Sequence, residues 1–511
     1  MLTFARPQPP SPEAKVDTVP PACGDVRACR ASRALPALAL LALAVAGCGG
    51  QKGTITVSII VPANTSDPFA GAATVHVALG DPPLYDTTAS VSGGHFSAEI
   101  QFSPPSGMAV DGPVVVEALD SGGKLVARGQ SPTLGVQPID YTVAVFVGSV
   151  GQVGNAPASL GSARAGVAGA AIPRVGAIIV GGTAMGTAST SCDVYDAYYH
   201  QVVPGTPMPT ARAGAVAVGF DRPSADNGAA FLVGGGPSAS APSAEVTQFD
   251  PQPGTAGVWS ALATDETGSL ARLSPTVVAL GDGTLLVTGG RDKGGNTLAG
   301  AAIVAPQPSS VSVTPLMRAM TTPRIGHTAT DLKLPSGDDG ALIFGGNTAG
   351  AAAELYDAAR QSFVELPDLM QPARTGHTAT ALPDGRVLIA GGSDDTSAAL
   401  ASGFVVAPSG NTLTATPLPQ LLSTRRAGHT ATLIGKQVLI CGGTDDQHKA
   451  LASCDVLDAT TLTPLEQPIK LAAARSGHLA LVLDTGNVLL AGGVDGAGTP
   501  VTTLELYTPL P

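Results

Sequence analysis

The chain has 511 residues, of which 44% are hydrophobic, and it is rich in Gly (64 residues) and Pro (43 residues). This apolar content excludes a disordered chain, and the length predicts two or three domains. The net charge of −12 and the aromatic content of 4% count against a nucleic-acid partner and leave few residues for a sugar-stacking or base-stacking platform. No long segment has a 3.6-residue apolar period, so the folded part is predicted to be nearly all β.

Residues 1–47 are predicted to be a signal region. Arg27, Arg30 and Arg33 precede an apolar run that ends in V-A-G-C at Cys48. The run is too short for a comfortable transmembrane helix. Its order of basic, apolar and small residues before a cysteine resembles the lipobox of bacterial lipoproteins, and the resemblance implies cleavage before Cys48 and a diacylglycerol on its thiol. An ordinary secretory signal peptide with a chance cysteine is the alternative.

The predicted anchor also suggests a location. Residues 48–52 are interpreted as the lipidated cysteine and a short tether, and several acyl chains hold a protein firmly to a bilayer. Gly49 stands where enterobacterial lipoproteins of the inner membrane have Asp, which favours the outer membrane, on its periplasmic or cell-surface side. Residues 1–25 fit no part of a signal peptide, and a translation start near Val26 is the alternative.

Residues 53–140 are predicted to form a small immunoglobulin-like β-sandwich. The β-rich runs are 54–61, 73–79, 95–102 and 113–119, and Gly, Pro, Asp and Ser separate them. No cysteine lies in this region to form an inter-sheet disulfide. We interpret the domain as a spacer between lipid and the rest of the chain, with an independent binding module as the alternative.

The remainder contains seven copies of one pattern, each with an arginine, an apolar strand, a turn, a second apolar strand and a double glycine. The double glycines begin at Gly181, Gly234, Gly289, Gly345, Gly391, Gly442 and Gly492, at intervals of 46 to 56 residues. The arginines are Arg164, Arg212, Arg272, Arg324, Arg374, Arg426 and Arg475. A third strand follows, for example E-L-Y-D from Glu354, and some copies show a fourth.

A period near 50 residues with four strands per unit resembles the kelch repeat, and this resemblance implies a seven-bladed β-propeller over residues 141–511. The clearest copy reads R-T-G-H-T-A-T from Arg374, with Gly-Gly after the second strand. The first three copies depart from the pattern: Val167 and Ala215 replace the histidine, and the third copy reads R-L-S-P from Arg272. The last copy lacks a fourth strand, which residues 143–147 and the following G-S-V-G-Q-V are predicted to supply, closing the ring without an exposed edge.

Strand direction places the seven arginines and the loops after Gly-Gly on one face of the propeller. The candidate ligand face therefore comprises Arg324, Arg374, Arg426, Arg475, Asp394, Asp395, Asp445 and Asp446. Asp292 and Asp495 occupy similar loops. The functional interpretation is a polar mouth for an anionic or hydroxylated ligand, or a cation site. The structural interpretation is that each arginine ties blades together through backbone carbonyls or an acid, while the loop acids are solvated.

Two further residue types recur. His327, His377, His429 and His478 share one repeat position, and we expect structural hydrogen bonding because metal ligands must converge on one ion. Cys441 and Cys454 fall on strands predicted to be adjacent and antiparallel, so a disulfide between them is a candidate. Neither a catalytic residue nor a cofactor is predicted.

The sequence favours a monomeric, non-catalytic, membrane-anchored lipoprotein whose propeller binds an unknown protein or glycan of the bacterial envelope. The alternative is an enzyme resembling the copper-radical galactose oxidases, which share this propeller. That chemistry needs a Tyr cross-linked to Cys, a second Tyr and two His around copper. Tyr356 and Tyr507, however, belong to the repeated E-L-Y motif. The fold alone does not decide between binding and catalysis.

Overall fold

The computed structural model describes residues 39–44, 54–63, 65–91, 110–136, 141–221, 227–252, 256–265, 267–307, 310–334, 336–346, 353–369, 373–409 and 412–511. Cys48, most of the predicted signal region and the predicted strand at 95–102 lie outside these ranges. The described residues form no α-helix and one short 3-10 helix, η1 (Pro367–Leu369). Within them no helix is long and apolar enough to span a membrane. The expected all-β fold is confirmed.

The N-terminal β domain contains two main sheets. The three-stranded sheet has the order β1 (Ala39–Ala44), β2 (Thr54–Ile60) and β9 (Tyr141–Phe146), with β2 and β9 parallel. The five-stranded sheet has the order β10 (Gly148–Ser149), β7 (Leu125–Gln130), β6 (Val114–Leu119), β3 (Thr74–Leu79) and β4 (Tyr85–Ser90). A separate pair joins β5 (Val110–Gly112) and β8 (Leu134–Val136). Buried valines from both main sheets, such as Val57, Val77 and Val116, form one hydrophobic cluster.

The predicted strands at 54–61, 73–79 and 113–119 correspond to β2, β3 and β6. Residues 39–44, which the sequence assigns to the signal region, pair antiparallel with β2 as β1.

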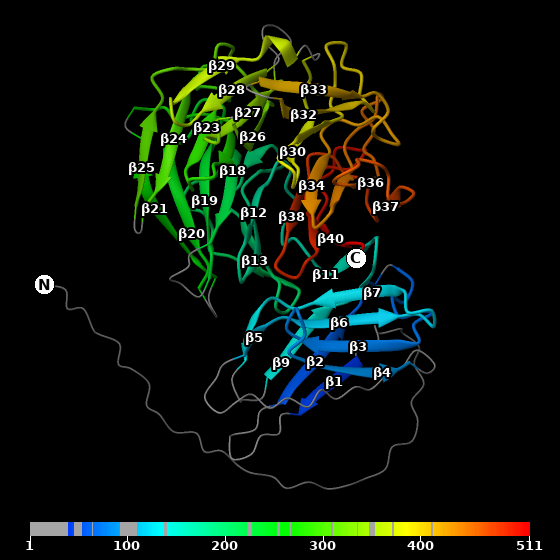
Figure 1. Ribbon diagram of the computed structural model, residues 1–511. Coiled ribbons are helices and arrows are strands. Elements are labelled where there is room, and N and C mark those ends of the chain that lie inside the picture. Colours follow the sequence, from blue (N-terminus) through cyan, green and yellow to red (C-terminus); the bar gives the residue numbers. More distant parts are fainter. Residues whose placement is uncertain are drawn as a thin grey trace, which may run out of the picture. The chain divides into compact units, whose positions relative to one another are not determined.

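In the part of the chain that the structure describes, seven four-stranded antiparallel sheets follow (Figure 1). The first contains β12 (Ala168–Ile172), β13 (Gly176–Val180), β16 (Cys192–Asp196) and β17 (Gln201–Pro204). The second contains β18 (Ala213–Phe220), β19 (Ala229–Gly236), β20 (Glu245–Asp250) and β21 (Val258–Thr264). The third contains β22 (Thr276–Ala279), β23 (Leu285–Thr288), β24 (Ala301–Pro306) and β25 (Val311–Pro315). The fourth contains β26 (Thr328–Lys333), β27 (Asp339–Phe344), β28 (Ala353–Asp357) and β29 (Ser362–Glu365).

The remaining three sheets continue the pattern. The fifth contains β30 (Thr378–Ala381), β31 (Val387–Ala390), β32 (Gly403–Ser409) and β33 (Thr412–Leu418). The sixth contains β34 (Thr430–Ile434), β35 (Gln437–Cys441), β36 (Ser453–Asp458) and β37 (Ile469–Lys470). The seventh contains β38 (Leu479–Val482), β39 (Val488–Ala491), β40 (Thr503–Thr508) and β11 (Gln152–Ser159). Two short strands, β14 (Thr183–Ala184) and β15 (Thr187–Ala188), form a hairpin after the first double glycine.

The hydrophobic core is divided among the gaps between neighbouring sheets. Phe344 of the fourth sheet, for example, packs in one cluster with Ile389 and Phe404 of the fifth. The second strand of each sheet is buried on both faces, which explains why the sequence shows continuous apolar runs there instead of alternation. The first strand of each sheet contacts the first strand of the next, and β38 contacts β12, so the series of sheets closes on itself. This arrangement is compatible with a β-propeller.

The seventh sheet is completed by a strand from the other end of the repeat region. β11 pairs antiparallel with β40 (Figure 1). In this pairing Val153 lies opposite Tyr507. The sequence places this strand too early. Residues 143–147 belong largely to β9, which pairs with β2 in the N-terminal domain, and the predicted boundary at 141 therefore lies inside that domain. The misassignment has a physical cause: 143–147 is the more apolar run, yet it is needed in the core of the small domain, where Val143 and Val145 are buried.

Each sheet has two distinct ends. The Gly-Gly end carries the repeated arginine and the double glycine, and the hairpin end carries the turns from strand one to two and from strand three to four. The N-terminal domain contacts the hairpin end: Gln130 Nε2 donates to the carbonyl oxygen of Asp484 at 3.1 Å, and Phe146 N donates to His200 Nε2 at 3.2 Å. The candidate sites below are described by the end of the sheets at which they lie, the Gly-Gly end or the hairpin end.

Candidate functional site

The seven repeated arginines are buried inside their own sheets. In every sheet the arginine Nη1 donates to the carbonyl oxygen of the first glycine of Gly-Gly, at 2.8 to 3.3 Å. Among the described residues, Nη1 also donates to a carbonyl at the start of the third strand in six sheets, as Arg426 does to Ser453 at 2.9 Å. A guanidinium has five donors in a fixed plane, so one side chain satisfies carbonyls that the bend would otherwise leave unpaired.

Five of the seven arginines also pair with an acid on the third strand. The pairs are Arg164–Asp193, Arg212–Glu245, Arg324–Glu354, Arg426–Asp455 and Arg475–Glu505. In the fifth sheet Phe404 takes the place of the acid, and the guanidinium carbon of Arg374 lies 5.3 Å from the centre of its ring. Burial lowers the pKa of Arg374 to about 10, so this side chain is still charged at neutral pH.

From the second sheet to the seventh, the backbone of the repeated arginine ties its sheet to the preceding one. The second glycine of Gly-Gly donates its N–H to the carbonyl oxygen of the next arginine, as Gly392 does to Arg426 at 2.9 Å. The side chain therefore holds its own sheet together while the carbonyl joins two sheets. The assignment of Arg324, Arg374, Arg426 and Arg475 to a ligand face is wrong, because these guanidinium groups turn inward to satisfy buried carbonyls and acids.

The loop aspartates on the Gly-Gly end shape their own loops. In each of four loops, Oδ1 of the aspartate accepts hydrogen bonds from the backbone N–H groups two and four residues later. The four residues are Asp292, Asp394, Asp445 and Asp495. The side-chain hydrogen bond from Thr396, followed by backbone N–H groups, lowers the pKa of Asp394. Asp446 Oδ1 accepts the N–H of Ala399 in the preceding sheet at 2.8 Å, and Asp395 is exposed.

These acids do not build a metal site. Within the part of the chain that the structure describes, no group of three or more His, Cys, Asp or Glu side chains is arranged to hold an ion. The Gly-Gly end thus offers a ring of separate loops, each with its aspartate engaged in a local turn.

The four repeated histidines link consecutive sheets. Each Nε2 lies 2.8 to 3.0 Å from a threonine hydroxyl of the preceding sheet, in the pairs Thr288–His327, Thr328–His377, Thr378–His429 and Thr430–His478. Burial, together with the neighbouring arginine, lowers the pKa of His377 and of His478 to about 3. The rings are therefore neutral and belong to the scaffold, one in each of four gaps.

Cys441, Cys454, Tyr356 and Tyr507 are also buried. Cys441 and Cys454 form a disulfide across β35 and β36, with their Cα atoms 4.1 Å apart. Cys192, at the same repeat position as Cys454, is a free thiol, and burial raises its pKa to about 12. Tyr507 donates from its hydroxyl to Gln437 Oε1 at 2.7 Å, and Tyr356 packs against Phe363. The contacts of both tyrosines serve packing between strands.

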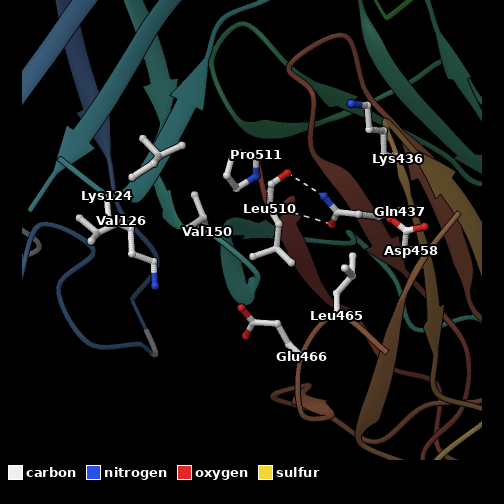
Figure 2. A pocket seen from close by; sticks show the side chains of 11 residues that line it. Lys124, Val126, Val150, Lys436, Gln437, Asp458, Leu465, Glu466, Leu510 and Pro511 are labelled. Atoms are coloured by element: carbon white, nitrogen blue, oxygen red, sulfur yellow. Dashed lines mark hydrogen bonds between the residues drawn. The ribbon is translucent and has the colours of Figure 1, made fainter. Parts of the chain in front are cut away.

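Two pockets lie at the opposite, hairpin end. A pocket of about 570 Å³ is lined by Lys124 and Val126 of the N-terminal domain and by Gln437, Asp458 and Glu466 of the repeat region (Figure 2). Gln437 is not available to a ligand there, because its amide donates to the carbonyl oxygen of Leu510 at 2.6 Å and accepts the N–H of the same residue at 3.2 Å. This pocket is therefore bordered by a side chain that fastens the final strand.

A second pocket, of about 840 Å³, is formed by the hairpins of the first two sheets and the N-terminal domain. Tyr198, Tyr199, Gln201 and Phe249 line it, together with Val143 from the small domain. The repeat pattern does not identify Tyr198, Tyr199 and Gln201, because they lie in and just after the turn that follows its third strand. The available signal was a departure from the repeat: Asp196 is followed by A-Y-Y, whereas Asp357 is followed by A-A-R and Asp458 by A-T-T.

Comparison with known proteins adds little to this geometry. No protein-family model and no curated protein matches the chain. A solved structure described as "Structure of YjhT" is similar to 59% of this chain and 95% of that chain, at 16% sequence identity and a TM-score of 0.44. A likeness this remote carries no argument, so the fold rests on the sheets themselves.

Proposed function

We propose that this chain is a lipid-anchored protein of the bacterial cell envelope, in which a seven-bladed kelch-type β-propeller binds a protein or a glycan without transforming it. In this proposal the N-terminal domain is an immunoglobulin-like spacer that Cys48 attaches to the outer membrane. The observation that carries the binding function is that the repeated charged residues already have partners inside the protein. The arginines and four loop aspartates are engaged in hydrogen bonds of the scaffold. The recognition surface is then left to residues outside the repeat pattern.

The kelch assignment is supported by the equivalence of the repeats. Arginine, the Gly-His bend, the second strand and Gly-Gly recur in the same order, and each repeated arginine donates to the first glycine of Gly-Gly in its own sheet. Gly376, Gly428 and Gly477, which precede the histidines, all have positive φ angles of about 60°, where a Cβ is unfavourable. Backbone hydrogen bonds join them in series, from Gly477 N to Gly428 O and from Gly428 N to Gly376 O.

A binding function is favoured over the copper-radical alternative by the surroundings of the residues that such chemistry would need. Cys192 faces Gly205 inside the first sheet, and Tyr356 and Tyr507 pack between strands. The copper content of the purified protein tests this choice. We expect no stoichiometric copper after incubation with the metal and dialysis, and one tightly held copper per chain would overturn the proposal.

The anchor is tested separately, by mass spectrometry of the membrane fraction. The expected result is an acylated N-terminal peptide that begins at Cys48, and loss of the protein from membranes in the Cys48→Ser variant. An unmodified Cys48 would contradict the anchor and leave the binding function standing. Protease treatment of intact cells then distinguishes the two sides of the outer membrane: propeller peptides are lost if the protein faces the medium and protected if it faces the periplasm.

A further inference from the structure

In the first sheet, the turn between the third and fourth strands, β16 and β17, carries two aromatic side chains, Tyr198 and Tyr199. The scaffold does not require aromatic residues at these positions. Asp196 Oδ1 accepts the N–H groups of Tyr198 and Tyr199, at 2.8 and 3.2 Å. Asp458 caps the same turn in the sixth sheet through Thr460 and Thr461. The turn therefore forms equally well without aromatic residues, so the tyrosines have a role outside the turn.

Both tyrosines border the pocket of about 840 Å³. Tyr199 is 61% exposed although it lines a concave surface, and Tyr198 donates from its hydroxyl to the carbonyl oxygen of Thr133 in the N-terminal domain at 3.4 Å. Val175, Val194 and Val203, which are partly exposed, contribute apolar surface, and Gln201 contributes an amide. An apolar wall with a few polar groups is the usual composition of a small-molecule site.

The charged groups at this pocket already have partners. Arg174 Nη2 lies 2.6 Å from Asp221 Oδ1, and its backbone N–H donates to Asp484 of the seventh sheet. Its φ angle of +60° places it in the left-handed region, which costs a non-glycine residue free energy and is sustained by these contacts. Asp196 is occupied by its turn, and burial raises its pKa. An ionic ligand would have to displace these partners.

The class of ligand follows from the tyrosine rings and the carboxamide that line the pocket. A tyrosine ring presents an apolar face and a polar edge, and a carboxamide both donates and accepts hydrogen bonds. A neutral sugar matches both, since it has an apolar C–H face and hydroxyl groups that donate and accept. A wholly apolar ligand would offer the Gln201 amide no hydrogen-bond partner. A folded protein partner generally needs a flatter and larger surface.

We infer that this pocket binds a short neutral saccharide, with a sugar ring stacked on Tyr199. The inference rests on the proposed binding function and selects glycan over protein as its ligand. Because the first sheet, the second sheet and the N-terminal domain all contribute to the lining, the small domain is a part of the binding site as well as a spacer.

The test uses the full chain solubilised in a detergent without a sugar headgroup, which would otherwise compete for the site. Neutral and anionic oligosaccharides are screened on an array, and the best neutral binder is titrated by calorimetry. The variants are Tyr199→Ala and Tyr199→Phe, with Arg360→Ala as the matched control, because Arg360 holds the equivalent turn position in the fourth sheet.

We expect Tyr199→Ala to weaken binding about tenfold or more, as removal of an aromatic anchor does, while Tyr199→Phe and Arg360→Ala retain wild-type affinity within about threefold. Equal affinity of Tyr199→Ala and wild type would overturn the pocket as the site, although the protein would still be a glycan binder. Binding of anionic glycans alone, or of a protein ligand alone, would overturn the neutral saccharide and leave the proposed binding function intact. Absence of any glycan binder would likewise overturn the inference.

Discussion

Arg324 Nη2 lies 2.8 Å from Glu354 Oε1, and neither side chain is exposed to solvent. The carboxylate also accepts the backbone N–H of Thr321 at 2.8 Å, so this ion pair fastens the segment that enters the fourth sheet. Buried pairs of this kind add little net stability compared with an apolar pair, but loss of one partner leaves an uncompensated charge. Their role is to hold the bend in one geometry.

The first prediction compares Arg324→Met with Arg374→Met. Arg374 also donates to the first glycine of Gly-Gly but faces Phe404 in place of an acid, so its removal leaves no buried carboxylate. We expect Arg324→Met to lose about 3–5 kcal/mol of unfolding free energy. The loss for Arg374→Met should be about 1–3 kcal/mol, from unpaired carbonyls. Urea denaturation measures both, and equal losses would show that Glu354 is not the deciding partner.

A second prediction concerns Gly391, whose φ angle is +56°. An added Cβ would lie 2.6 Å from the Arg426 carbonyl oxygen and 2.7 Å from His429 Cε1, which belong to the next sheet. Gly385, in the hairpin of the same sheet, has a φ angle of +83° but no heavy atom within 4 Å of such a Cβ. Both Ala substitutions cost about 1–2 kcal/mol for the left-handed backbone, and overpacking adds about 1–3 kcal/mol for Gly391→Ala alone. Similar unfolding midpoints for the two variants would contradict the close contact between sheets.

The third prediction is a pH dependence of stability. Burial lowers the pKa of His327, His377 and His478 to about 3 in the folded protein, below the unfolded value of about 6.5. Between these values the unfolded chain binds more protons, so the unfolding free energy is full above pH 6.5 and declines as the pH falls towards 3. We expect His377→Gln to show a shallower decline from pH 7 to pH 4.5 than wild type. The exposed His448 provides the control, since His448→Gln should follow the wild-type profile.

The fourth prediction uses the difference between two equivalent positions. Cys441 faces Cys454 in the sixth sheet, whereas Val180 faces Cys192 in the first, so Cys441→Val reproduces the arrangement of the first sheet. The disulfide closes a short loop with a sequence separation of 13. Its loss should therefore cost roughly 3 kcal/mol or less. The wild type should lose stability when a reductant is added, and the variant should not. A reductant-insensitive wild type would contradict the disulfide.

Much of the fold was predictable because the same sequence pattern marks the strands in every repeat. The second strands are buried on both faces, so they appear as uninterrupted apolar runs before each Gly-Gly. The strand that closes the seventh sheet was misplaced, because β11 reads Q-V-G-N-A-P-A-S and has a weaker apolar signal than 143–147. Its register depends on pairing with β40, more than three hundred residues later, which no local pattern reveals.

The candidate site was harder to predict than the fold. Strand direction places Arg374 and Arg426 at the correct end of their sheets, but it does not say whether a side chain points outward or into the sheet. That choice depends on unpaired carbonyls at Gly-Gly, which become visible only in three dimensions. Tyr199 could be found in the sequence as a departure from the repeat, whereas the pocket beside it requires Val143 from a different domain.

The most direct test of the account compares two neighbouring arginines. Arg426 is fully buried against Asp455, while the side chain of Arg425 is 60% exposed and lies 4.0 Å from Asp446. If the repeated arginines are scaffold, Arg426→Met should lower the unfolding free energy by about 3–5 kcal/mol. Arg425→Met should change it by no more than about 0.5 kcal/mol. Unfolding free energies that are the same for both variants and close to wild type would contradict the claim, and would return Arg426 to the surface as a candidate ligand contact.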